Sequence, residues 1–71
     1  MPTDTALIGA IFEKVQATSN EVQQTVTEAM GYLAYGKGPW KHSIAVETTD
    51  RALKRTTLLL RQIRALRSAL L

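Results

Sequence analysis

A short glycine and proline segment near the middle of the chain constrains the fold more than any other feature. Residues 36–39 read Gly-Lys-Gly-Pro and separate two long segments with helical periodicity. Glycine readily takes the left-handed conformation that ends a helix, and proline suits the first turn of the next one. The pattern predicts an all-α fold, with helices over about residues 4–35 and 40–70. So short a connection makes the helices antiparallel neighbours, which defines one helical-hairpin domain over residues 1–71.

Apolar residues recur at spacings of three and four in the first segment, as in an amphipathic helix. They are Leu7, Ile8, Ile11, Val15, Val22, Val26, Met30 and Leu33. Ile11, Val22 and Leu33 are spaced by eleven residues, which favours a nearly straight stripe. Three hydroxyl residues interrupt this stripe, namely Thr18, Ser19 and Thr25. We interpret them as a thin section where the helices approach closely, rather than as a polar site. Thr3 or Asp4 can cap this helix.

The second segment carries a stripe that alternates strictly between spacings of four and three. Its members are Ala45, Thr49, Ala52, Thr56, Leu59, Ile63, Leu66 and Leu70. This spacing is typical of a coiled-coil seam, and Leu53 and Leu60 widen it. The unbroken register favours one continuous helix, although residues 48–50 (Thr-Thr-Asp) could cap a later start.

Folding the chain at the turn brings opposite charges together. Residues 1–35 carry one basic and four acidic side chains, whereas residues 36–71 carry eight basic and two acidic ones. The antiparallel pairing sets Val22 against Leu53 and Glu21 near Lys54. Exposed ion pairs stabilise by only about 0–1 kcal/mol each, so we expect them to select the orientation of the helices more than to hold them together.

The apolar stripes are too wide for a lone hairpin to bury. The chain has 71 residues and no cysteine, so burial and association must stabilise it. We expect completion into a helical bundle, either by a second copy (a homo-oligomer, with a four-helix bundle as the simplest form) or by a helical partner protein. The expected contact residues are Ile8, Ile11, Phe12, Val15, Leu53, Leu59, Leu60, Ile63, Leu66 and Leu70. We expect the large residues near the open end of the hairpin to form the main contact.

The turn also carries aromatic residues. Trp40 is the only tryptophan, and Tyr35 precedes the turn. Trp40 could cap the closed end of the hairpin, or it could act with Tyr35 as a secondary, exposed anchor for a partner.

The sequence carries no pattern typical of catalysis. Carboxylates are scattered, and no Ser, His and Asp spacing indicates a nucleophile. His42 is the only histidine, and we interpret it as a solvated side chain rather than a metal ligand. The Gly-Lys-Gly turn lacks the Gly-Lys-Ser/Thr ending of a phosphate loop. We therefore expect a protein that is not an enzyme and holds no cofactor.

Five basic residues of the second segment could form a binding face. They are Arg51, Lys54, Arg55, Arg61 and Arg64. A charged outer face serves solubility, but a row of arginines could also follow a phosphate backbone or lie on an anionic membrane. Nucleic-acid binding by a dimeric hairpin is therefore a second hypothesis. We rank it below association, because the aromatic residues typical of single-strand binders are missing from residues 41–71.

No segment predicts a membrane span or a signal peptide. The longest aliphatic run, Leu58 to Leu60, is far shorter than the roughly 20 residues a spanning helix needs. No basic side chain precedes an apolar run at the N-terminus. We expect a cytoplasmic protein by default, and export without a cleaved signal would leave the same pattern.

Two architectural resemblances follow from these patterns. The Val26-Thr27-Glu28-Ala29 helix, the Gly/Pro turn and the amphipathic C-terminal helix resemble the small hairpin subunits and co-chaperones of bacterial type III secretion. The paired prolines common in the needle turn are absent here. The size and hairpin plan also resemble the small RNA-binding bundle proteins of plasmid copy control. The first resemblance implies an assembly subunit or a co-chaperone.

Overall fold

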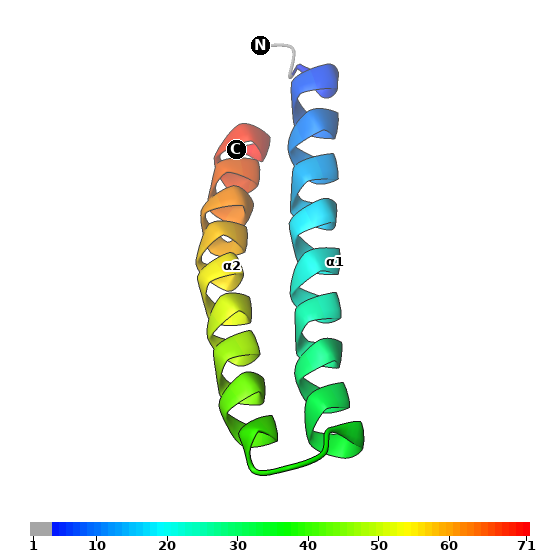
Figure 1. Ribbon diagram of the computed structural model, residues 1–71. Helices are drawn as coiled ribbons and strands as arrows, with labels where there is room; N and C mark the ends of the chain where they lie inside the picture. Colours follow the sequence, from blue (N-terminus) through cyan, green and yellow to red (C-terminus); the bar gives the residue numbers. More distant parts are fainter. Residues whose placement is uncertain (1–3) are drawn as a thin grey trace.

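The computed structural model describes residues 4–71 as two antiparallel helices that lie side by side (Figure 1). Helix α1 spans Thr5–Tyr35 and helix α2 spans Trp40–Leu70. No strand occurs among residues 4–71, and the two helices pack along each other, so the predicted all-α hairpin is confirmed. The molecule is a rod with extents of 59 × 15 × 10 Å.

Local backbone chemistry sets the ends of α1. The Asp4 carboxylate accepts a hydrogen bond from the Leu7 N–H at 3.1 Å, which satisfies one of the free donors of the first turn. Thr3, the alternative cap, lies outside the described residues. At the other end the Gly36 N–H donates to the Tyr32 carbonyl at 2.9 Å, and Gly36 itself is extended. A Cβ on Gly36 would collide with that same carbonyl oxygen.

The turn uses its second glycine for the left-handed conformation. Gly38 has a φ of +89°, which side chains with a Cβ rarely adopt. Pro39 follows in the helical region and directly precedes α2. Helix α2 then continues without a break through residues 48–50, so the later start does not occur.

The helices contact each other through small side chains. The buried residues are Thr18, Thr25 and Ala29 on α1 and Ala45, Thr48 and Ala52 on α2. The buried hydroxyls of Thr25 and Thr48 each donate to a carbonyl one turn earlier in their own helix, both at 2.8 Å. We call this contact between the helices the seam. Because the two hydroxyls already have hydrogen-bond acceptors, Thr25 and Thr48 need no polar partner on the other helix.

The first correction concerns the repeat on α1. Contact positions recur every seven residues rather than every eleven: Ile8, Val15 and Val22 are half-buried and Ala29 is buried. Leu33, which the eleven-residue pattern placed in the stripe, is 43% exposed. A seven-residue repeat keeps one face of a helix toward its neighbour along the whole length.

The second correction concerns the face that α2 turns toward α1. Thr48 is the most deeply buried residue, whereas its neighbour Thr49 is exposed. Leu53 is 61% exposed and does not pack against Val22 as expected. Half of the predicted stripe does lie along the contact, namely Ala45, Ala52, Leu59 and Leu66, whereas Thr49, Thr56, Ile63 and Leu70 are exposed. Thr48, one position before Thr49, makes the closest contact, because small side chains there and at Ala45 and Ala52 allow the helices to approach.

Candidate interaction surface

Most of the large apolar side chains lie on the surface rather than between the helices. We call the following set the apolar side: Phe12, Val26, Met30, Leu33, Val46, Leu53, Leu60, Ile63 and Leu70. Their exposed fractions range from 43% to 66%. Scattered surface leucines are ordinary, but a continuous apolar face on a small protein marks a contact surface.

Helical geometry aligns these residues on each helix. On α1, Phe12, Val26 and Leu33 belong to a line of residues spaced by seven, with Ser19 between them. On α2, the same spacing relates Val46, Leu53 and Leu60, and a parallel row adds Thr49, Thr56 and Ile63. Because seven residues make nearly two turns, each line follows one face of its helix.

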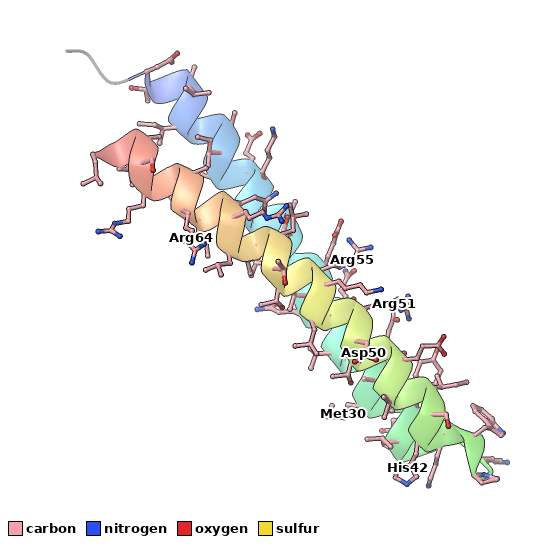
Figure 2. The ribbon with its side chains drawn as sticks, turned by 90° about the vertical axis from the view of Figure 1, so that its left-hand side faces the viewer. Met30, His42, Asp50, Arg51, Arg55 and Arg64 are labelled. Carbon is pink, nitrogen blue, oxygen red and sulfur yellow. The ribbon has the colours of Figure 1, made fainter. Side chains whose placement is uncertain are left out.

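The two lines face the same side of the hairpin. A shallow groove near the turn, of about 230 Å³, is lined by Leu33 of α1 together with Val46 and Thr49 of α2. Figure 2 shows Met30 and His42 projecting from one edge of the helix pair, away from Arg51 and Arg55. The apolar side therefore spans both helices.

The opposite side of the hairpin is charged. Glu21 forms an ion pair with Arg55, and the Glu28 carboxylate lies 3.8 Å from the Arg51 guanidinium. We call this face, which also carries Lys54 and Leu58 beside the two arginines, the charged side. The paired side chains are 49–60% exposed, so each pair stabilises by only about 0–1 kcal/mol. The expected partner of Glu21 was Lys54, one position away from the observed Arg55.

Four of the five basic residues singled out in the sequence share the charged side, and only Arg64 lies away from it. Arg51 and Arg55 are paired with the acidic residues of α1. Arg64 projects from the edge that carries Met30 and His42 (Figure 2). Lys54 and Arg61, spaced by seven, remain on the charged side.

The structure divides the predicted contact residues into two groups. Half-buried positions along the seam are Ile8, Ile11, Val15, Leu59 and Leu66. Exposed positions on the apolar side are Phe12, Leu53, Leu60, Ile63 and Leu70. In the single hairpin, only the side chains of the second group are exposed enough to contact a partner.

Four residues of the apolar side were not among the predicted contact residues. They are Val26, Met30, Leu33 and Val46. The seven-residue spacing from Phe12 identifies Val26 and Leu33, and the same spacing before Leu53 identifies Val46; Met30 lies beside the α1 line without belonging to it. They extend the surface from the open end to the turn.

Two polar residues interrupt the seam in its open half. Arg55 and Gln62 continue the seven-residue register of Thr48 and so occupy positions that point toward α1. Arg55 reaches out to Glu21, while the Gln62 Oε1 atom is buried without a hydrogen-bond partner. A buried acceptor without a partner costs about 1–3 kcal/mol, so Gln62 offsets part of the stabilisation from the apolar residues around it.

The aromatic residues lie at the closed end. Tyr35 is 86% exposed, and Trp40 is half-exposed at the start of α2. A Cβ on Gly38 would come within 2.9 Å of the Trp40 Nε1 atom, so the indole lies against the turn. Trp40 thus covers the turn with part of its surface and leaves the rest open.

Acidic residues and His42 do not gather into a site. Within residues 4–71 no group of three or more His, Cys, Asp or Glu side chains could hold a metal ion. His42 lines the apolar groove beside Asp50. Over the same residues, neither helix has a stretch long and apolar enough to cross a bilayer.

The geometry defines an antiparallel helical hairpin with one charged and one apolar side. The chain matches no protein-family model, no curated protein and no solved structure among those compared with it.

Proposed function

We propose that this chain is a non-enzymatic hairpin protein that acts by protein–protein association. Its apolar side is the contact surface, and its role is that of a self-assembling subunit or a small adaptor or co-chaperone that supplies two helices to a partner. The observation that carries the proposal is the gathering of nine exposed large apolar residues on one side of the hairpin, whereas within residues 4–71 the charged side exposes only Leu7, Tyr35 and Leu58 among its charges. A concentration of exposed apolar residues on one face of a small protein marks a contact surface.

The small size of the buried core supports the same proposal. Only alanines and threonines are buried between the helices, and each removes little apolar area from water. A chain of this length with such a core is marginally stable alone. A partner that covers the apolar side buries further apolar area and so adds the stabilisation that the lone hairpin lacks.

Sedimentation equilibrium of the full chain tests the proposal. Association predicts a mass above the 7.8 kDa of one chain, either from self-assembly or from a bound protein that copurifies with it. The Ile63→Asp variant, which places a charge on the apolar side, should shift the mass toward one chain. A stably folded parent protein that sediments as one chain and carries no bound protein would contradict the proposal.

The competing hypothesis is nucleic-acid binding through Arg51, Lys54, Arg55, Arg61 and Arg64. It has less support, because Arg51 and Arg55 already face carboxylates on α1. A salt titration with generic duplex RNA and DNA separates the two hypotheses, since phosphate contacts weaken steeply with salt. Association through the apolar side predicts no salt-sensitive binding at low ionic strength.

A further inference from the structure

We infer that a second copy of this chain covers the apolar side, in a two-fold dimer whose turns lie at opposite ends. Ser19 and Thr56 lie at the two-fold axis, so that α1 packs on the partner's α1 and α2 on the partner's α2. This dimer rests on the proposed function and deepens it by naming the partner and its orientation.

The area of the apolar side fits one further copy. Its nine side chains are each about half exposed, and together they offer roughly 800 Å² per copy, close to the share that each partner gives to a stable interface. The apolar side runs along both helices from near the turn to the open end, so two rods laid face to face cover most of it. A short peptide would leave much of it in water.

The apolar residues of α2 are arranged symmetrically about Thr56. Leu53 precedes Thr56 by three positions and Leu60 follows it by four; Thr49 and Ile63 lie seven positions before and after it. An antiparallel pair of α2 helices centred on Thr56 therefore sets Leu53 beside the partner's Leu60 and Thr49 beside the partner's Ile63. Such alternation of three and four is the spacing that packs one helix against another.

The line on α1 has the same symmetry about Ser19. Phe12 and Val26 lie seven positions before and after Ser19, so an antiparallel pair sets Phe12 beside the partner's Val26. The two centres also lie at one level of the hairpin. The ion pair between Glu21 and Arg55 fixes the register, and Ser19 and Thr56 lie within two residues of it. One axis therefore serves both helices.

Small side chains at the axis allow the close approach that a two-fold contact needs. Ser19 lies between Phe12 and Val26 on its line, and Thr56 lies between Leu53 and Leu60 of the neighbouring line. The Thr56 hydroxyl donates to the Ala52 carbonyl at 2.8 Å and so needs no partner from the second copy. The bulkier residues then fill the space on both sides of the axis.

Charges at the border favour turns at opposite ends. Asp50 and Arg64 lie on one outward line of α2, seven positions before and after Thr57 (Figure 2). Asp50 also lines the groove beside Leu33, at the edge of the apolar side. Two antiparallel α2 helices bring Asp50 near the partner's Arg64, and symmetry makes this contact twice.

The arrangement with both turns at one end lacks this match. It would set each α2 against the partner's α1, where Lys14 is the only basic residue that could approach Asp50. Lys14 lies seven positions before Glu21, on the charged side, so Asp50 would have no cationic partner in that arrangement.

Single cysteine variants test the dimer, because the natural chain has no cysteine. Residues on a two-fold axis meet their own copies within disulfide reach. We expect Thr56→Cys and Ser19→Cys each to form a disulfide dimer at least tenfold faster than Lys54→Cys, the matched control on the charged side. Helical circular dichroism checks that each variant folds.

Two results would overturn the dimer. In the first, neither Thr56→Cys nor Ser19→Cys cross-links faster than Lys54→Cys. In the second, Ser19→Cys and Thr56→Cys cross-link to each other when the two variants are mixed but neither cross-links to itself, which indicates α1 against the partner's α2. If the parent still sediments above the mass of one chain in either case, the proposed association stands and only the arrangement is wrong. A folded parent protein that sediments at the mass of one chain and carries no bound protein contradicts both the proposed association and the dimer.

Discussion

The two sides of the hairpin are built from the same two helices and differ in what surrounds each exposed apolar residue. Ile63 on the apolar side and Leu58 on the charged side are equally exposed, at 45%. Ile63 lies on a face of apolar neighbours, whereas Leu58 lies among Arg51, Lys54 and Arg55. The exposure of one residue therefore does not identify a contact surface, but the continuity of its neighbours does.

Between the two sides lies a seam whose fully buried residues are all alanine or threonine. These residues let the helices approach closely but bury little apolar area. The charged side adds only weak ion pairs. The apolar side is thus the largest remaining source of stabilisation, and its occupant is expected to stabilise the fold itself.

The largest effect is expected from Ile63→Asp. A carboxylate in the centre of a covered apolar surface loses its hydration without gaining a partner. The dissociation constant of the assembly should rise by about 100-fold or more, as measured by sedimentation equilibrium. Leu58→Asp is the matched control and should change the dissociation constant by less than about threefold. If Ile63→Asp and Leu58→Asp raised the dissociation constant equally, the apolar side and the charged side would not differ in their contribution to association.

The next effect concerns the seam and distinguishes it from the apolar side. Thr48→Leu inserts bulk into the closest helix contact, where Thr48 is only 1% exposed. We expect the free energy of unfolding to fall by about 1–3 kcal/mol in urea titrations. Thr49→Leu, one position along on the apolar side, should leave the stability unchanged or raise it. If Thr49→Leu instead lowered the free energy of unfolding and Thr48→Leu did not, the seam would lie one residue later on α2.

A smaller effect is expected at the turn that both sides share. Gly38→Ala forces a residue with a Cβ into a φ of +89° and against the Trp40 indole. The free energy of unfolding should fall by about 1 kcal/mol or slightly more, measured by the same titration. Lys37→Ala is the control and should have little effect. An unchanged stability in Gly38→Ala would show that the turn adopts another conformation in solution.

The smallest effect is expected on the charged side. A double-mutant cycle with Glu21→Gln and Arg55→Gln should give a coupling energy of about 0–1 kcal/mol, and added salt should reduce it. The ion pair is about half exposed, so water and ions screen it. A coupling well above this range would mean that the charged side holds the helices together.

The hairpin itself could be predicted from the sequence. Two glycines and a proline end one helix and begin the next, and no comparable breaker occurs within either helical segment. The antiparallel contact and the pairing of acidic α1 with basic α2 followed from the short turn. Thr18 and Thr25, expected in a thin section, are indeed buried.

Only half of the seam on α2 could be predicted from the apolar pattern. The line with Ala45, Ala52, Leu59 and Leu66 was expected at the contact and lies there, whereas the pattern favoured the line with Thr49 and Ile63 over the line with Thr48. Thr48 and Thr49 differ by one position, or about 100° around the helix, yet only Thr48 is buried. Hydrophobicity favours turning Ile63 and its line toward α1, whereas close approach favours the line of Thr48. The spacing of the apolar residues alone does not show whether hydrophobic burial or close approach decides which line faces α1.

Oxidation of Met30 tests most directly whether the apolar side is the covered surface. Met30 is 66% exposed in the isolated hairpin, and peroxide converts an exposed thioether to its sulfoxide. The Ile63→Asp variant serves as the uncovered reference. We predict that Met30 oxidises several-fold more slowly in the assembled parent than in this variant, by mass spectrometry over time. Equal rates in an assembled parent and in Ile63→Asp would contradict the account, because the association would then use another surface.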